Sequence, residues 1–197
     1  MAHTKLEIIG QAMGLREMIG LSPTDIVADI EVSVSDIGYI LGEKSFGDRF
    51  SAYCTYLENE KFAIVLNTDH DWNENFRRFT ISHEIGHLNL IQHLAALQKG
   101  NLYKSRPEFQ TIDPIEKEAD YFAINFLAPK AAFEKATQFK DFSFDSILEI
   151  GEYFGISILA SAFRFVELTD LTCTLISVDV STGKVKYEKR SREFEDL

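Results

Sequence analysis

The chain has 197 residues, a length that suits one domain or one domain with a small appendage. Its 31 acidic and 20 basic residues give a net charge of −11, which disfavours nonspecific attraction to nucleic acid or to an anionic membrane. We expect a cytoplasmic protein without membrane association, because no apolar run approaches the roughly 18 residues needed to cross a bilayer and the start lacks a secretory signal pattern. Cys54 and Cys173 are predicted to be free, buried thiols.

The first quarter of the chain contains two helix patterns and a short strand pattern. Apolar residues recur at helical spacing from Leu6 to Ile19, and Gly20 ends this segment. A capping serine and a proline at residues 22–23 predict a second, short helix through about Ile30. Alternating valines and serines at residues 32–35 then predict a brief strand, followed by a loop over residues 42–47.

Residues 50–66 have the pattern of a β-hairpin. Two apolar runs, residues 50–56 and 62–66, flank a polar turn at residues 58–61. A polar loop then leads directly into the next helix, so we expect one hairpin strand to lie beside that helix. Our hypothesis is that this strand is a sheet edge, where an extended peptide substrate can pair backbone to backbone.

The next helix contains the motif His-Glu-x-x-His at residues 83–87 and is predicted to run from about Arg77 to Gln98. His83 and His87 are four residues apart, so both imidazoles can reach one metal ion from one helix face. Glu84 lies close enough to touch a metal-bound water without ligating the metal. Two nitrogen donors beside a carboxylate suit zinc, which keeps an open coordination position in catalytic sites.

A third zinc ligand is predicted on the acidic helix that starts at Asp113-Pro114. Glu116 and Asp120 share one face, which would let Glu116 bind the metal while Asp120 accepts the other ring N–H of a ligating histidine. Asp113 and Glu116 also have the spacing of a capping box, a purely structural alternative. Glu118 is a weaker candidate ligand, because it points about 200° away from Glu116 and has no equivalent partner.

His93 is a second alternative for the third ligand. The spacing of His83, His87 and His93 matches the metzincin pattern, but that pattern needs a glycine at position 90, where this chain has Leu90. On a straight helix His93 would lie roughly 15 Å along the axis from His83 and about 80° off its face. The remaining histidines, His3 and His70, are expected to be solvated.

The two helices together resemble the ImmA/IrrE family of small gluzincin-type metallopeptidases. The resemblance rests on residues 78–87, 116–123 and 126–129, within a match that spans about residues 62–168. It implies a zinc-peptidase core that cleaves or inactivates a helix-turn-helix transcriptional repressor. Ser82 stands where the family usually has alanine, and Asp120 stands where many members have asparagine.

The expected chemistry is zinc-assisted peptide hydrolysis. Zinc would lower the pKa of its bound water and polarise the scissile carbonyl, while Glu84 would transfer the proton from water to the leaving amine. An additional donor for the transition-state oxyanion is also expected, and the sequence does not choose among its candidates. These are Tyr103, Tyr121, Tyr153 and Arg164.

The C-terminal part predicts more helices and a closing β-hairpin. A helical stretch follows Pro129, then Ser143 and Ser157 cap two short helices that have the pattern of a helix-turn-helix unit. The second of these helices has one arginine and many bulky apolar residues, so direct nucleic-acid binding is disfavoured and packing on the core is expected. Residues 171–187 read as two strands around a Ser-Thr-Gly turn.

These patterns predict an α+β protein with a compact zincin-like core, in which helices pack on a small β-sheet. The core is expected over residues 1–140, and the helical pair and the β-hairpin over residues 141–197. The predicted function is a zinc metalloendopeptidase with a specific protein substrate. The alternatives are a metal-binding module that sequesters a regulator without cutting it and a DNA-binding regulator.

Overall fold

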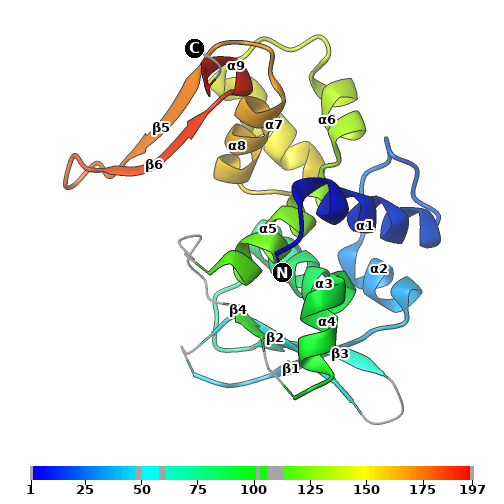
Figure 1. Ribbon diagram of the computed structural model, residues 1–197. Helices are drawn as coiled ribbons and strands as arrows, with labels where there is room; N and C mark the ends of the chain where they lie inside the picture. The colour runs from blue at the N-terminus through cyan, green and yellow to red at the C-terminus, as the bar shows by residue number, and fades with distance from the viewer. Residues whose placement is uncertain (1, 48–49, 58–60, 101–102, 106–112, 196–197) are drawn as a thin grey trace. The chain divides into compact units, whose positions relative to one another are not determined.

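The computed structural model describes residues 2–47, 50–57, 61–100, 103–105 and 113–195, which form two compact units, residues 1–132 and 133–197 (Figure 1). The first unit contains α1 (Lys5–Met18), α2 (Ile30–Ile37), β1 (Ile40–Lys44), β2 (Ala52–Tyr56), β3 (Phe62–Asn67), α3 (Glu74–Asn89), α4 (Ile91–Leu97), β4 (Tyr103–Ser105) and α5 (Pro114–Leu127). Helix α6 (Lys130–Thr137) crosses the boundary, and the second unit continues with α7 (Phe144–Phe154), α8 (Ile158–Leu168), β5 (Thr174–Val178), β6 (Val185–Arg190) and α9 (Arg192–Glu195). This architecture confirms the predicted α+β class.

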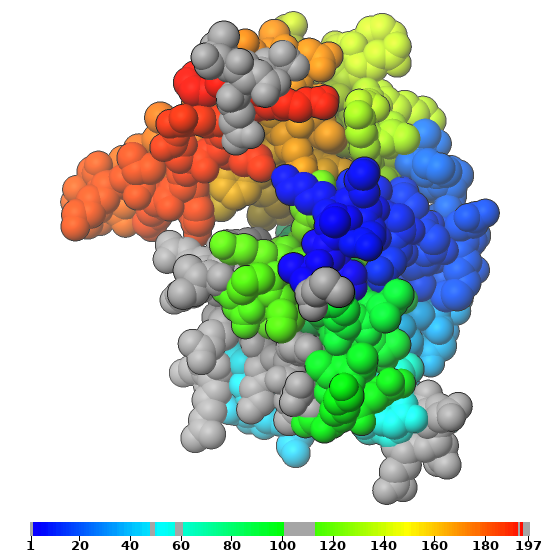
Figure 2. Space-filling view, viewed as in Figure 1, coloured from blue at the N-terminus to red at the C-terminus, as the bar shows by residue number. Residues whose placement is uncertain are grey.

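Helix α1 is joined to α5 by a buried arginine. Arg16 is 1% exposed, and its guanidinium donates hydrogen bonds to the carbonyl oxygens of Phe126, Ser22 and Asp25 at 2.5, 3.1 and 2.6 Å. A buried guanidinium is tolerated only when its donors find acceptors, and here they hold the loop after α1 against the end of α5. The N-terminal segment, blue, consequently adjoins the green surface of α4 and α5 (Figure 2).

The segment between α1 and β2 differs from the predicted order of elements. No helix forms at residues 22–29, and the predicted strand at residues 32–35 lies instead within α2. Asp29 caps α2 by accepting hydrogen bonds from the backbone N–H groups of Glu31 and Val32. The predicted loop at residues 42–47 is in part strand β1, which pairs in parallel with β3.

The sheet confirms the predicted hairpin but not its place at an edge. Strands β2 and β3 pair antiparallel, with Ala52 opposite Leu66 and Tyr56 opposite Phe62, while part of the predicted turn, residues 58–60, lies outside the described residues. The strand order is β1-β3-β2-β4, so both hairpin strands are internal. The expectation that one hairpin strand is a sheet edge is therefore wrong, because β2 pairs with β4 and β3 pairs with β1.

Helix α3 ends earlier than predicted. The predicted single helix to Gln98 breaks at Leu90, whose ψ of 116° is extended, and α4 begins at the next residue. Leu90 is fully buried and serves as both the last cap of α3 and the first cap of α4. A buried leucine thus makes the turn for which a glycine had been expected to be necessary.

Helices α3 and α5 approach each other closely at Gly86. A Cβ atom placed on Gly86 would lie 3.1 Å from the Cβ of Phe122 and 3.2 Å from two of its ring atoms. Such separations are tighter than ordinary van der Waals contact, so the glycine is what permits the approach. Asp113 starts α5 by accepting from the backbone N–H of Ile115, which places the first turns of α5 beside the histidines of α3.

The second unit has an aromatic core. Phe133 lies 5.7 Å from Phe154 and 5.1 Å from Phe165 between ring centroids. The predicted caps Ser143 and Ser157 start α7 and α8, whose axes differ in direction by 109°, and β5 pairs antiparallel with β6 as predicted. Over the described residues, none of the helices alone has the length and apolarity of a membrane span, although the bent pair α7 and α8 meets those two criteria jointly.

Candidate metal centre

Three predicted ligands converge between α3 and α5. The Nε2 atoms of His83 and His87 lie 3.0 Å apart. The carboxylate of Glu116 reaches both, with one oxygen 3.2 Å from Nε2 of His83 and the other 3.5 Å from Nε2 of His87. The two histidines are 5% and 0% exposed, so these donors meet in a site largely closed to water.

The donor set fits a tetrahedral zinc ion. Ligands held at about 2.0–2.1 Å from zinc lie roughly 3.3 Å from one another in a tetrahedral shell. The observed separations of 3.0, 3.2 and 3.5 Å bracket that spacing. Two imidazoles and one carboxylate also leave a fourth position open, which is the arrangement of catalytic rather than structural zinc sites.

The electrostatics of the site favour a positive charge between the ligands. Burial lowers the pKa of His83, but its hydrogen bonds with Asp120 and Glu116 outweigh burial and raise this pKa to about 10. Burial lowers the pKa of His87 to about 3, so this ring is neutral. Burial alone would raise the pKa of Glu116, yet the two histidines hold it well below its usual range. The carboxylates thus stabilise a cation at this point, as a metal site requires.

Asp120 occupies the position predicted for a partner of a ligating histidine. Its Oδ1 lies 2.8 Å from Nδ1 of His83, the ring nitrogen opposite the one that faces Glu116. A carboxylate accepts the Nδ1–H proton, which leaves the lone pair of Nε2 for a metal. Glu116 faces the metal position, and Asp120, four positions further along α5, orients the ligand His83.

Glu84, next to His83 in the sequence, is fully buried and interacts with Cys54 of β2. Burial raises the pKa of the Cys54 thiol well above its usual value, and a hydrogen bond with Glu84 raises it further. The thiol therefore stays protonated and donates to the carboxylate of Glu84. The sequence predicted Cys54 only as a free, buried thiol, because the contact depends on how β2 packs against α3.

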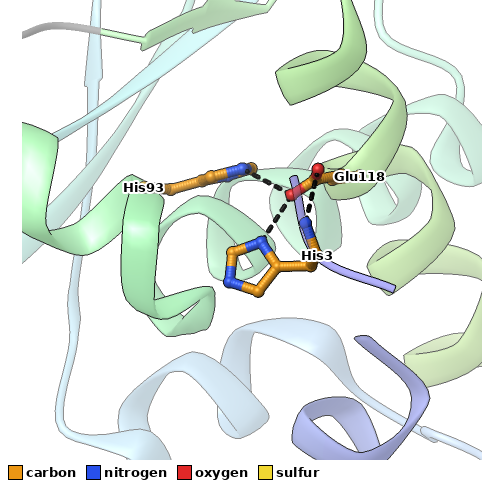
Figure 3. A group of neighbouring side chains, drawn as sticks. All are labelled: His3, His93 and Glu118. Carbon is orange, nitrogen blue, oxygen red and sulfur yellow. Dashed lines mark hydrogen bonds and ion pairs between the residues drawn. The ribbon is translucent and has the colours of Figure 1, made fainter. Parts of the chain in front are cut away.

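A second group of donor atoms lies next to the first. His93, Glu118 and His3 place one ring nitrogen or carboxylate oxygen each within 4.8 Å of one another (Figure 3). Glu118 is 8% exposed and contacts a histidine on each side, His3 and His93. The side chain of His3 is 5% exposed, so the expectation that it is solvated is wrong.

His93 reaches this group because the helix breaks at Leu90. Its Nδ1 lies 3.0 Å from Nδ1 of His87, whereas a straight helix would have carried it roughly 15 Å along the axis from His83. His93 therefore contacts His87 on the side opposite Glu116. His70, the other histidine expected in solvent, is half-buried, with Nε2 3.0 Å from the carbonyl oxygen of Phe50.

The four candidate oxyanion donors lie in different places. The side chain of Tyr103 lies outside the described residues, and the ring of Tyr121 lies 5.5 Å from the Lys5 ammonium. Tyr153 and Arg164 belong to the second unit. Arg164 is 2% exposed and donates to Glu167 at 2.8 Å, so its charge is engaged inside that unit.

The sequence family agrees with the geometry of the site. The family model described as the IrrE N-terminal-like domain of peptidase family M78 matches residues 44–166, which contain both helices that supply the donors. The chain belongs to this family. The resemblance to the ImmA/IrrE family is thereby confirmed, and with it the assignment to a peptidase family.

The IrrE-like fold also occurs in a solved structure of a Mycobacterium tuberculosis transcriptional regulator. The two share 13% sequence identity at a TM-score of 0.62. The likeness covers 94% of this chain and 55% of the regulator, so the chain spans about half the length of that protein. At this identity the likeness shows the fold alone. A comparison with curated proteins gave no match.

Proposed function

We propose that this M78-family protein is a zinc-dependent endopeptidase that cleaves or inactivates one specific protein, a helix-turn-helix transcriptional repressor. The observation that carries the zinc assignment is the convergence of His83, His87 and Glu116 at tetrahedral spacing, with Asp120 behind His83. The repressor substrate is supported by the family resemblance.

The chain's own residues divide the work of peptide hydrolysis. Zinc at this site supplies a Lewis acid for the scissile carbonyl and a water of lowered pKa. Glu84 accepts the proton of the attacking water and delivers it to the leaving amine. Asp120 keeps Nε2 of His83 directed at the metal position, and the negative charge of Glu116 offsets part of the metal charge.

The decisive experiment compares wild type with Glu84→Gln on purified helix-turn-helix repressors as candidate substrates. Mass spectrometry of the products detects new peptide termini. We expect cleavage by the zinc-loaded wild type, none with a chelator, and a roughly 10²–10⁴-fold slower rate in Glu84→Gln, the usual contribution of a general base. Because Gln is nearly isosteric with Glu, zinc content should stay equal in the two proteins.

Two outcomes would contradict this function. Cleavage by Glu84→Gln at the wild-type rate would exclude Glu84 as the base. A stable complex in which wild type binds the regulator and zinc but leaves the regulator intact would instead favour a sequestering module. A DNA-binding role has less support, because the single arginine of α8, Arg164, is buried and paired.

A further inference from the structure

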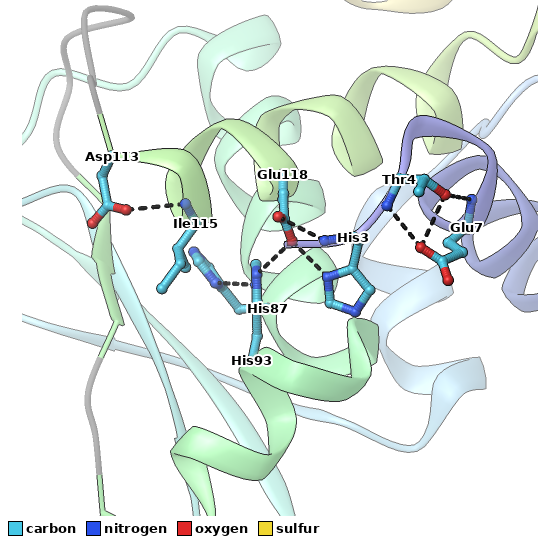
Figure 4. Close-up of polar contacts among 8 residues, drawn as sticks. All are labelled: His3, Thr4, Glu7, His87, His93, Asp113, Ile115 and Glu118. Carbon is cyan, nitrogen blue, oxygen red and sulfur yellow. Dashed lines mark hydrogen bonds and ion pairs between the residues drawn. The ribbon is translucent and has the colours of Figure 1, made fainter. Parts of the chain in front are cut away.

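A chain of hydrogen-bonded side chains leads from the metal centre to the N-terminal segment. Nδ1 of His87 lies 3.0 Å from Nδ1 of His93, and Nε2 of His93 lies 3.1 Å from Oε2 of Glu118 (Figure 4). The same oxygen lies 2.5 Å from Nδ1 of His3, whose backbone N–H donates to Oε1 at 2.9 Å. His87 and His93 are 0% and 2% exposed, so water has little access to these contacts.

The proton positions along this chain follow from what each group can accept. A carboxylate only accepts, so Nε2 of His93 carries the proton in its contact with Glu118. A neutral imidazole protonated at Nε2 has its lone pair at Nδ1, and that atom must accept from Nδ1–H of His87. The Nε2 atom of His87 then has no proton, and it is the atom that faces Glu116.

We propose that His93, oriented by Glu118, is a positioning residue that holds His87 in the tautomer able to bind zinc through Nε2. His93 does for His87 what Asp120 does for His83, but through an imidazole placed between the ligand and the carboxylate. The inference rests on the zinc site of the proposed function and does not depend on whether the protein cleaves a peptide.

A second metal ion at His3, His93 and Glu118 is the rival explanation, and it conflicts with the first site. If Nε2 of His93 bound a metal, the proton of a neutral His93 would lie on Nδ1 and would be donated to Nδ1 of His87. Nε2 of His87 would then carry a proton and could not bind zinc. In addition, the 2.5 Å separation between His3 and Glu118 is much shorter than the roughly 3.3 Å between ligands of a tetrahedral ion.

Two substitutions of His93 separate orientation from packing. His93→Phe keeps the ring volume but removes the acceptor, whereas His93→Asn loses volume but places an amide oxygen near the position of Nδ1. We expect zinc affinity, measured by competition with a chelating indicator, to fall about 10–100-fold in His93→Phe, the usual effect of losing such a partner. His93→Asn should recover part of this loss, and His70→Ala, which removes a histidine outside the cluster, should match wild type.

A role in packing alone predicts the opposite order, with His93→Phe closer to wild type than His93→Asn, and would overturn the proposal. Equal zinc affinity in wild type and both variants would also overturn it. Two zinc ions per wild-type chain and one in His93→Phe would establish the rival site. Wild type that binds no zinc would overturn the proposed metal centre itself, an outcome distinct from the failure of His93 alone.

Ring-nitrogen NMR of the metal-free wild type tests the same inference without any variant. Imidazole nitrogens with and without a proton have well-separated ¹⁵N chemical shifts. We expect the proton of His93 on Nε2 and the proton of His87 on Nδ1. The reverse arrangement in both rings would overturn the proposal.

Discussion

The helix pairs α3–α5 and α7–α8 are built by the same local rules but have opposite interiors. Each pair has capping residues at its helix starts and a glycine at a close contact, Gly86 in the first and Gly151 in the second. Between α3 and α5 the buried side chains include His83 and His87, which face Glu116. Inside the second unit they are mainly aliphatic and aromatic.

The polar interior between α3 and α5 contributes less to the stability of the fold than the apolar interior of the second unit. Burial of apolar groups such as Phe154 and Phe165 stabilises the fold directly, at roughly 25 cal/mol per Å² removed from water. Burial of an imidazole or a carboxylate destabilises the fold unless each polar atom finds a partner. The partners of the α3–α5 interior come from α4, α5, β2 and the N-terminal segment, so much of the first unit supports one small polar cluster.

The largest effect should come from removing a ligand from this cluster. Glu116→Ala should weaken zinc binding by more than the roughly 10–100-fold that loss of an outer partner causes. Glu118→Ala should stay within that range, because Glu118 contacts His93 rather than the metal ligands. Zinc competition assays on both variants measure this ranking. A larger loss in Glu118→Ala would instead make Glu118 the third ligand.

A substitution in the apolar interior of the α7–α8 pair should change the free energy of unfolding but not the zinc affinity. Phe165 is 6% exposed and lies against Phe133, so Phe165→Ala should lower the free energy of unfolding by about 3–5 kcal/mol. Urea denaturation measures this loss. Zinc affinity should not change, because every proposed ligand belongs to the first unit. Phe139→Ala is the matched control, since Phe139 is 93% exposed and its loss should cost less than about 0.5 kcal/mol.

The sequence was informative wherever a local rule determined the structure. The spacing of His83 and His87, the start of α5 at Asp113 and the serine caps of α7 and α8 all depend on neighbours within one helical turn. The placement of Glu116 opposite the histidines also follows from spacing, once α3 and α5 are assumed to pack together. The packing of α3 against α5 is a property of the tertiary structure, and residue spacing alone does not determine it.

The strand predicted at residues 32–35 is wrong because a local strand pattern competes there with a local helix pattern. Val32 and Val34 alternate with serines as in a strand, but Asp29 and Gly38 provide the caps of a helix between them. A helix of eight residues has too few apolar positions for its period to be read reliably. The caps were the better signal.

The contacts of His93 could not be predicted, because they depend on the break at Leu90. Leucine favours helix, and nothing local to residues 86–94 indicates an extended conformation at one buried position. The break brings His93 beside His87, and the N-terminal segment brings His3 to Glu118 from 115 residues away in sequence. Contacts of this range are set by the whole fold.

Gly86 and Gly151, the glycines at the two close helix contacts, allow the two helix pairs to be compared through smaller effects. An alanine at Gly86 would press on Phe122 at 3.1 Å, and an alanine at Gly151 would press on the carbonyl oxygen of Ile156 at 3.3 Å. Each change should destabilise the protein by about 1–3 kcal/mol, the usual cost of overpacking. Only Gly86→Ala should also weaken zinc binding, since it separates α5, with Glu116, from α3. Equal zinc affinity in both variants would show that the α3–α5 spacing does not control the site.

The smallest expected effect is a gain in stability from a glycine-to-alanine change at an open position. It tests whether the loss expected in Gly86→Ala comes from the close contact with Phe122. Gly10 lies on the exposed side of α1, and an added Cβ would meet no described atom within 4 Å. Gly10→Ala should therefore raise the free energy of unfolding by up to about 1 kcal/mol, the difference in helix propensity between the two residues. Gly20→Ala is the matched control: its Cβ would also be unobstructed, but its φ of 79° is costly for alanine, so stability should fall by about 1–2 kcal/mol. Denaturation midpoints at constant m-value measure both changes. If Gly10→Ala destabilised as much as Gly86→Ala, the loss at Gly86 could no longer be attributed to its contact with Phe122.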